Sequence, residues 1–278
     1  MVALEYFNLC LHAQPFDERS LPLGGRSVIA VIPARYGSTR LPAKPLSDIA
    51  GVPMVVRVWR QAKLARSIER VAVATDDQRI AEAVTAAGGE VIMTSSVHPS
   101  GTDRIAEVAG KLLADVYLNV QGDLPFVDPA DLDALITPML AEPDLSMATL
   151  ATPLTDPEEW HNPNVVKLVC DERGDALYFS RSPIPFARDG GIPPQARRHI
   201  GVYAYRRDFL LRFAALQPGV LEMIEKLEQL RALERGYRIR VVASVKPSLE
   251  VDTAEDLARA RQIAVAVAGA GGGDVGAE

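Results

Sequence analysis

The sequence predicts an α/β protein built on a doubly wound, mostly parallel sheet. Short apolar runs that fit strands buried on both faces, such as Val28–Ile32 and Val116–Val120, alternate with segments of helical periodicity. This alternation indicates parallel strands, because the connection between two of them usually contains a helix. In residues 165–205 closely spaced strands replace the alternation, which predicts a smaller antiparallel lobe within the same domain.

The expected elements follow one another without long gaps. In chain order they are a strand at Val28–Ile32, a helix at Met54–Ala65, a strand at Val71–Ala74, a helix at Asp77–Ala87, a strand at Val91–Met93, a helix at Asp103–Leu113 and a strand at Val116–Val120. Gly88 and Gly89 are typical of a helix end. Asp128 followed by Pro129 is typical of a helix start, with the aspartate as N-cap.

The lobe is expected to be an antiparallel ribbon. Its strands are predicted at Val165–Cys170 and Ala176–Ser180, with a turn at 171–174, and a further strand at Ile200–Tyr205. The whole domain is expected to span residues 27–263. Residues 1–26 are polar and irregular and predict a disordered extension, and residues 264–278 are rich in Ala and Gly and predict a flexible tail.

Composition excludes several classes of protein. The formal net charge of −6 argues against a nucleic-acid partner, since such proteins usually present a basic face. No apolar run is long enough for a membrane span, so membrane insertion is not expected. The start of the chain lacks the basic residues of a signal peptide, and Cys10 and Cys170 lack metal-ligand spacing. A cytoplasmic protein with reduced thiols is predicted.

A basic loop after the first strand is the most informative local feature. It carries Arg35, Arg40 and Lys44, and Gly37 and Ser38 offer close backbone approach and a hydroxyl donor. Three neighbouring cations repel one another unless an anion lies between them, so a polyphosphate ligand is predicted. The alternative is a solvated basic loop. The loop contains neither a Walker sequence nor a G-x-G-x-x-G.

Nine motifs in sequence order carry a resemblance to a known family. They are PARYGSTRLPAKPL (Pro33–Leu46), VATDD (Val73–Asp77), PSGTDR (Pro99–Arg104), NVQGD (Asn119–Asp123), NPNVVKLV (Asn162–Val169), ALYFSRSPIP (Ala176–Pro185), HIGVYAYR (His199–Arg206), LEQLRAL (Leu227–Leu233) and VDTAEDL (Val251–Leu257). With these motifs the chain resembles the 3-deoxy-manno-octulosonate cytidylyltransferases, also called CMP-Kdo synthetases. The resemblance extends from about residue 28 to residue 263 and implies a Rossmann-like nucleotidyltransferase fold.

The resemblance implies a reaction and its catalytic groups. CMP would pass from CTP to the sugar acid 3-deoxy-manno-octulosonic acid (Kdo), with release of pyrophosphate, for lipopolysaccharide synthesis. Arg35, Arg40, Lys44 and Asp123 would be catalytic, and Asp123 and Asp252 would hold Mg²⁺ against the triphosphate. A homodimer is also implied.

The remaining site residues divide into two groups. The resemblance assigns nucleotide binding to Ser38, Ser100, Gly101, Arg104 and Gln121, and sugar binding to Arg181, Arg188, His199, Tyr203, Glu228 and Gln229. A guanidinium suits the carboxylate of a sugar acid, and the other side chains suit its hydroxyls.

Structural roles are the alternative for several of these residues. Asp123 could be a turn or capping residue, Asp252 could cap the helix from Thr253, and Ser100-Gly101 could be a plain turn before a helix. Arg104 could be solvated on the first helical turn, and His199 could be a core histidine. Glu228 and Gln229 could belong to the solvated face of an amphipathic helix at Glu225–Glu234.

Two departures from the family pattern flank the expected metal ligands. Leu124 stands where the family usually has Glu, and Glu250 stands where it usually has Gly. Both leave the aspartates in place but bear on the choice of sugar. The alternatives are therefore a cytidylyltransferase for another ulosonic acid or an amino variant and, from a different class, an inactive binding or regulatory family member.

Overall fold

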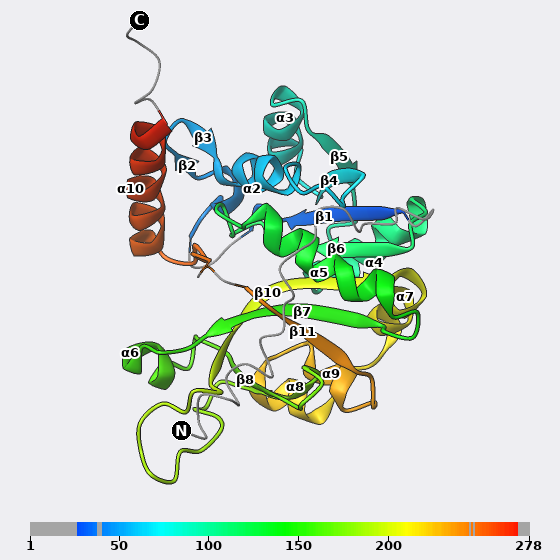
Figure 1. The fold of residues 1–278 in the computed structure, drawn as a ribbon. Coiled ribbons are helices and arrows are strands. Elements are labelled where there is room, and N and C mark those ends of the chain that lie inside the picture. The colour runs from blue at the N-terminus through cyan, green and yellow to red at the C-terminus, as the bar shows by residue number, and fades with distance from the viewer. Residues whose placement is uncertain (1–26, 38–40, 245, 247, 272–278) are drawn as a thin grey trace, which may run out of the picture.

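The protein is described here by a computed structural model covering residues 27–37, 41–244, 246 and 248–271 (Figure 1). Its elements are β1 (Val28–Ala34), η1 (Lys44–Leu46), β2 (Asp48–Ile49), β3 (Val52–Pro53), α2 (Met54–Ala62), β4 (Arg70–Thr75), α3 (Gln78–Ala86), β5 (Glu90–Met93), α4 (Gly101–Lys111), β6 (Val116–Asn119), α5 (Pro129–Ala141), β7 (Met147–Pro153), α6 (Pro157–His161), β8 (Lys167–Cys170), β9 (Ala176–Ser180), β10 (Arg197–Arg206), α7 (Arg207–Ala215), α8 (Val220–Glu225), α9 (Leu230–Leu233), β11 (Ile239–Ala243) and α10 (Ala254–Gly271).

One mixed sheet organises the molecule. Its strands lie in the order β11-β7-β10-β6-β1-β4-β5, and β5, β4, β1 and β6 are parallel to one another. Strand β10 runs antiparallel between β6 and β7, whereas β11 is parallel to β7. The predicted α/β fold with a mostly parallel core is therefore confirmed.

Helices cover both faces of this sheet. On one face, side chains of α2, α3 and α5 such as Val58, Ile80 and Leu135 pack in a core cluster with β1. On the other face, Ile105 of α4 and Phe209 of α7 pack in a second cluster. The direction of the crossovers explains this division, because the chain first moves outward from β1 to β5 and then returns past β1 to β6.

The lower half of Figure 1 holds the predicted antiparallel lobe. Strands β8 and β9 pair antiparallel across the turn at 171–174, as the sequence predicts, and β8 also pairs with the first residues of β10. The predicted strand at Ile200–Tyr205 lies within β10, which joins the main sheet between β6 and β7 and is not confined to the lobe. Strands β7 and β11 and helix α7 were not predicted.

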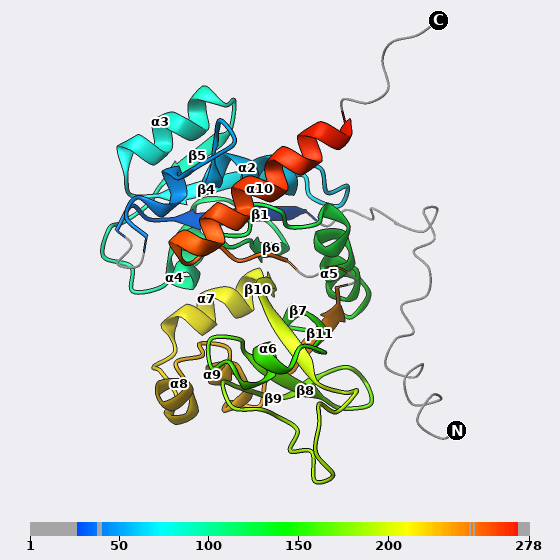
Figure 2. The same cartoon turned by 90° about the vertical axis from the view of Figure 1, so that its left-hand side faces the viewer.

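Helix α10 corrects the predicted start of a flexible tail at residue 264. The helix continues to Gly271, and Ala264 is buried beside Leu257 and Ala260. These side chains pack on Ile49 and Met54 in a small separate cluster. Figure 2 shows α10 lying along the half of the molecule that holds β1 and α2. The predicted extension at 1–26 and residues 272–278 lie outside the described residues.

Within the described part of the chain, no helix combines the length and the hydrophobicity that a membrane crossing requires.

Candidate active site

A pocket lies where the order of the parallel strands reverses. From β1 the chain moves to β4 and β5 on one side and then returns to β6 on the other side, so the strand order reverses between β1 and β6. Crevices at such switch points are the usual ligand sites of open α/β sheets. The pocket there has a volume of ≈ 320 Å³. It brings together eight of the predicted site residues: Arg35, Lys44, Ser100, Gly101, Arg104, Gln121, Asp123 and Asp252.

Gly122 allows the loops after β1 and β6 to meet. A Cβ atom at this position would lie 3.1 Å from the backbone oxygen of Pro33, a contact closer than most side chains tolerate. The missing side chain therefore lets the turn of Gln121 and Asp123 approach β1 closely.

Asp123, Asp252 and Lys44 form the polar centre of the pocket. The backbone N–H of Val251 donates to the Asp123 carbonyl at 2.9 Å, which fixes the segment before α10 against the loop after β6. Lys44 Nζ, on the short helix η1, donates to Asp123 Oδ2 and Asp252 Oδ1, at 2.7 Å each. Burial lowers the pKa of Lys44, but the two carboxylates outweigh it, so this pKa is raised and the ammonium is retained.

The carboxylates suit a divalent cation. Ligand oxygens of Asp123, Glu250 and Asp252 lie within 4.8 Å of one another. Asp123 Oδ1 is buried and has no hydrogen-bond partner among the described residues, so one strong acceptor remains for a ligand. Hard cations such as Mg²⁺ prefer carboxylate oxygens. The donor set therefore fits the metal that the sequence predicts.

The alternative role of Asp252 as a helix cap is not what the structure shows. The side chains of Thr253 and Asp256 cap the start of α10, since Asp256 Oδ2 accepts from the Thr253 N–H at 2.9 Å and Thr253 Oγ1 accepts from the Asp256 N–H at 3.2 Å. The Asp252 carboxylate is left to face Lys44. The turn at Asp123 likewise presents its carboxylate to the pocket.

The two departures from the family pattern have different consequences. Leu124 is buried in the core cluster of the β1 face and does not line the pocket, so the expected effect of this residue on the site is not supported. Glu250 does line the pocket, where its side chain still reaches solvent. The surrounding protein and the carboxylates of Asp123 and Asp252 raise the pKa of Glu250 to about 7.

The N-terminus of α4 forms another wall of the pocket. Ser100 is the N-cap, accepting from the Asp103 N–H at 3.2 Å, so its turn is both a helix start and a pocket wall. The alternative of a solvated Arg104 is wrong, because its guanidinium is buried against Thr94 and lies 3.0 Å from Asp76 Oδ1. Arg104 is thus held rigidly at the pocket.

His98 is a pocket residue that sequence reasoning missed. Its Nε2 contacts Glu107 Oε2, and Lys111 bonds the other oxygen of the same carboxylate at 2.6 Å. Hydrogen bonds from Lys111 and His98 lower the pKa of Glu107 to about 2. The available signal was the position of His98 directly before the PSGTDR motif.

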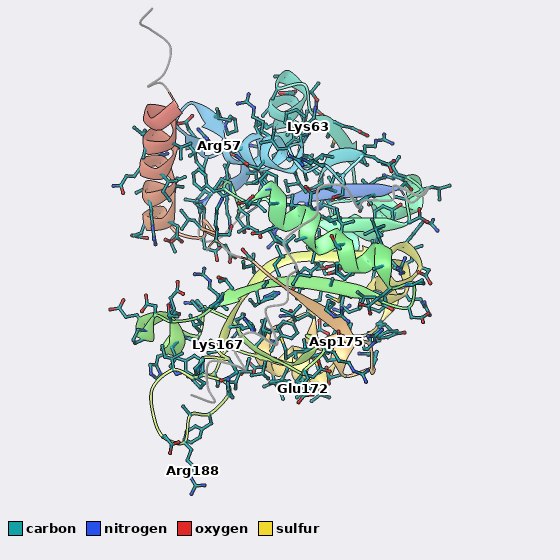
Figure 3. All side chains as sticks on the ribbon, viewed as in Figure 1. Arg57, Lys63, Lys167, Glu172, Asp175 and Arg188 are labelled. Atoms are coloured by element: carbon teal, nitrogen blue, oxygen red, sulfur yellow. The ribbon has the colours of Figure 1, made fainter. Side chains whose placement is uncertain are left out.

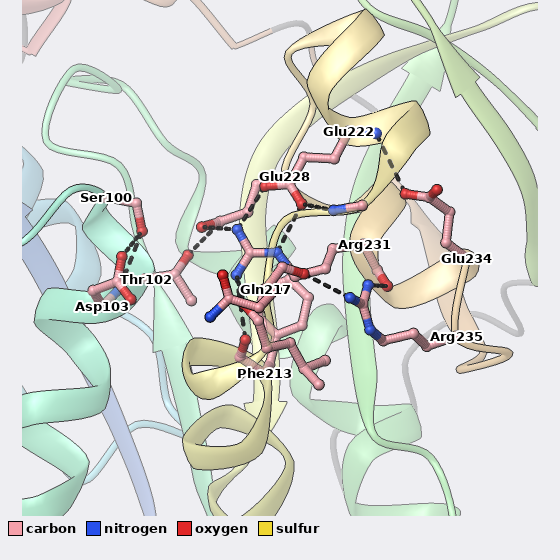
Figure 4. A network of polar contacts seen from close by, with 12 residues as sticks. Ser100, Thr102, Asp103, Phe213, Gln217, Glu222, Glu228, Arg231, Glu234 and Arg235 are labelled. Carbon is pink, nitrogen blue, oxygen red and sulfur yellow. Dashed lines mark hydrogen bonds and ion pairs between the residues drawn. The ribbon is translucent and has the colours of Figure 1, made fainter.

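Glu228 lies behind the α4 wall in a polar network (Figure 4). Thr102 donates to Glu228, and Arg231 lies 3.7 Å from it while pairing with Glu222 at 2.8 Å. Burial raises the pKa of Glu228 despite these contacts. The alternative of a solvated helical face is therefore wrong for Glu228, and also for Gln229, which is buried.

The expected helix at Glu225–Glu234 is interrupted. Helix α8 ends at Glu225, Lys226 adopts a left-handed conformation with φ 55°, and α9 begins only at Leu230. This break turns Glu228 toward α4.

His199 and Tyr203 lie in an aromatic row on β10. His199 packs edge-on against Phe179 at 5.2 Å and near Tyr203 at 5.4 Å, and its Nε2 is 2.9 Å from Thr149 Oγ1. Burial lowers the pKa of His199 to about 3, so the ring is neutral at physiological pH. Burial also raises the pKa of Tyr203, where the nearby Glu228 and Glu250 carboxylates add to the effect.

None of the six predicted sugar-binding residues lines this pocket, and two of them, Arg181 and Arg188, lie apart from the group on β10 and before α9. The Arg181 guanidinium donates to the carbonyls of Glu225 at 2.7 Å and Pro163 at 2.9 Å, which joins β9 to α8. Arg188 is exposed at the tip of the loop between β9 and β10 and points away from the rest of the chain (Figure 3). Ser38 and Arg40 lie outside the described residues.

Comparison with known proteins agrees with this geometry. Residues 29–239 match the family model described as cytidylyltransferase. The chain is 52% identical to the 3-deoxy-manno-octulosonate cytidylyltransferase of Syntrophotalea carbinolica, over 84% of this chain and 96% of that protein. It is 50% identical to the protein of the same name from Solibacter usitatus, over 86% of this chain and 94% of that protein.

A solved structure extends the likeness to three dimensions. A CMP:2-keto-3-deoxy-manno-octonic acid synthetase complexed with CTP superposes with a TM-score of 0.82 at 43% identity, covering 87% of this chain and 99% of that one. The resemblance carried by the nine motifs is thereby confirmed. With its polar centre at the switch point and this likeness along most of its length, the chain belongs to the 3-deoxy-manno-octulosonate cytidylyltransferase family.

Proposed function

We propose that the protein transfers CMP from CTP to 3-deoxy-manno-octulosonic acid and releases pyrophosphate. The observation that carries this proposal is the group of Lys44, Asp123 and Asp252 at the switch-point pocket. It combines cation and carboxylates in the way that positioning a triphosphate requires. The family members named above carry this activity in their names.

The residues of the pocket suggest how the nucleotide lies. Arg35, Lys44 and Arg104 line the cavity and supply positive charge, which suits the phosphates. The wall formed by Ser100 and Gly101 offers backbone groups that can read the edge of the base. Lys44 lies on η1 and Arg104 on α4, so these two cations are held by regular elements, and catalysis can rest on positioning.

The reaction is an attack of the anomeric hydroxyl of the sugar acid on the α-phosphorus of CTP. Asp123 and Asp252 would hold Mg²⁺, which would offset phosphate charge and lower the pKa of the attacking hydroxyl. Lys44 lies within hydrogen-bond distance of both carboxylates and places a further positive charge beside the transferred group. No covalent enzyme intermediate is needed.

The sugar acid is expected on the side of the pocket that faces β10. His199, Tyr203, Glu228 and Gln229 gather on β10 and in the segment before α9, behind the α4 wall. Their role in sugar binding stays a prediction, as does that of Arg181 and Arg188. Mg²⁺, a homodimer, a cytoplasmic location and a place in lipopolysaccharide synthesis also remain predictions from the resemblance.

Pyrophosphate release with CTP, Mg²⁺ and a set of ulosonic acids tests the proposal. We expect the eight-carbon 3-deoxy acid to give the highest kcat/KM. A higher value with an amino variant or a nine-carbon sialic acid would overturn the sugar assignment and favour the alternative substrate. No release with any acid would instead support the inactive binding or regulatory protein.

A further inference from the structure

Glu250 is a third carboxylate in the polar centre, at a position where the family pattern has Gly. Val251 turns into the apolar cluster with Ile49 and Met54, while its two neighbours Glu250 and Asp252 face the pocket. The bond from the Val251 N–H to the Asp123 carbonyl holds this segment in place. The backbone thus aims Glu250 at the same space as the two aspartates.

The Glu250 carboxylate is not part of the ion pairs that Lys44 forms with the two aspartates. Lys44 is shared between Asp123 and Asp252, and no hydrogen bond or ion pair to a described residue holds the Glu250 carboxylate. Arg198 acts on Glu250 only from a distance and is itself paired with Glu159 at 2.6 Å. The oxygens of Asp123, Glu250 and Asp252 lie within 4.8 Å of one another, so the three carboxylates repel one another until a cation is added.

The spacing of the three carboxylates fits a single small cation. Their oxygens lie within 4.8 Å of one another. Two oxygens on opposite sides of one Mg²⁺ ion, at about 2.1 Å each, lie about 4.2 Å apart. Small side-chain rotations would therefore bring all three carboxylates to one ion. The buried Asp123 Oδ1, which lacks a hydrogen-bond partner among the described residues, is available for the same contact.

We propose that Glu250 supplies a third carboxylate to the divalent-cation site, so that the free enzyme binds the cation before the nucleotide. The proposal rests on the metal site of the proposed function and assigns a role to a residue that departs from the family pattern. Two carboxylates alone hold Mg²⁺ weakly and normally need substrate phosphates to complete the site. A third carboxylate supplies a ligand that the substrate phosphates would otherwise provide.

The first test measures Mn²⁺ binding to the nucleotide-free protein by electron paramagnetic resonance at about pH 8. Glu250→Gln keeps the shape of the side chain and removes its charge, and we expect its dissociation constant for Mn²⁺ to rise about tenfold. Glu255→Gln is the matched control, because Glu255 is exposed on α10 outside the cluster, and its binding should be unchanged. Equal Mn²⁺ affinity in the wild type and in Glu250→Gln would overturn the proposal.

The second test separates this role from a structural one. Without metal, Glu250→Gln should melt at a higher temperature than the wild type, because a repelling charge is removed. Added Mg²⁺ should then raise its melting temperature by less than it raises that of the wild type. A fall in melting temperature without metal, or an undiminished response to Mg²⁺, would contradict the proposal.

Neither measurement needs the sugar acid or turnover. The pyrophosphate assay with wild-type protein therefore reports separately on the proposed function, and failure of one proposal leaves the other measurable.

Discussion

At the scale of single residues, the polar centre is assembled over long distances along the chain. Lys44 and Asp123 are 79 positions apart, and Lys44 and Asp252 are 208 positions apart, yet both pairs lie at 2.7 Å. Each aspartate balances part of the charge of one ammonium. Changing one of them alters the electrostatics of the whole cluster.

Replacement of Asp123 is expected to affect turnover much more than folding. Asp123→Asn keeps the shape and removes the charge that faces Lys44, and we expect kcat to fall at least about a hundredfold. Circular dichroism should stay unchanged. Asp128→Asn is a suitable control, because Asp128 caps α5 outside the pocket and its loss should spare activity. Near-normal turnover in Asp123→Asn would contradict the assignment.

His199 should make the protein less stable in acid. Its pKa is about 3 in the folded protein, against 6.5 for an unperturbed histidine, so the unfolded chain binds more protons between these values. The stability that the neutral ring contributes is complete above pH 6.5 and is lost as the pH falls, by up to about 1.4 kcal/mol per pH unit. Denaturant unfolding at pH values from about 8 down to about 5 measures this loss of unfolding free energy. His199→Asn should show a smaller loss over that range, and an equal loss would exclude His199 as the cause.

At the scale of elements, the site depends on where helices begin. Helix α4 starts at Ser100, which lines the pocket, and α10 starts just after Asp252. Helix starts present free backbone N–H groups and a partial positive charge, so they favour anionic ligands nearby.

Removal of the Ser100 hydroxyl should reduce stability without changing the preferred nucleotide. Ser100→Ala removes the N-cap of α4, and we expect unfolding free energy to fall by about 1 kcal/mol. If backbone groups read the base, the ratio of rates with CTP and UTP should stay the same. A clear gain of UTP activity would show that the side chain carries selectivity.

Helix α10 should contribute to stability up to its last turns. A chain ending at residue 263 loses Ala264, which packs on the Ile49 cluster. We expect its melting temperature to drop by about 2–4 °C for each kcal/mol of unfolding free energy that is lost. A chain ending at residue 271 keeps all described helical residues and serves as the control. Equal melting temperatures for the two chains would show that the end of α10 adds nothing.

At the scale of the whole molecule, the pocket joins the parallel half of the sheet to the segment before α10. Its walls come from β1, η1, α4, the loop after β6 and residues 250–252, so a ligand there contacts segments that lie far apart in the chain. Ligand binding should therefore stabilise the molecule as one unit.

CTP should raise the melting temperature more than UTP does. At about a hundred times its dissociation constant, a ligand adds about 2.7 kcal/mol of stability. Thermal unfolding with Mg²⁺ and either nucleotide measures the difference, and EDTA should reduce the CTP effect if a cation joins the phosphates to Asp123 and Asp252. An equal response to UTP would point to a different nucleotide specificity.

Local sequence signals predicted much of the fold. The apolar run of β1, the Asp128-Pro129 start of α5 and the turn between β8 and β9 were recognisable because each depends on neighbouring residues. Strand β10 was harder to place, because pairing with β6 and β7 involves partners 44 or more residues away in the sequence. The end of α10 was missed because an Ala- and Gly-rich composition does not reveal the apolar surface on which it packs.

The sequence by itself determined the fold class, the family and eight of the residues that line the pocket, since these depend on periodicity and on motifs that are contiguous in the chain. Only the tertiary structure decided which of the residues next to the two aspartates reach the pocket. Leu124 turns into the core and Glu250 turns into the pocket, although each stands beside an expected metal ligand. The direction of a side chain depends on the path of the backbone, and here that path is set by contacts between distant segments such as Val251 and Asp123.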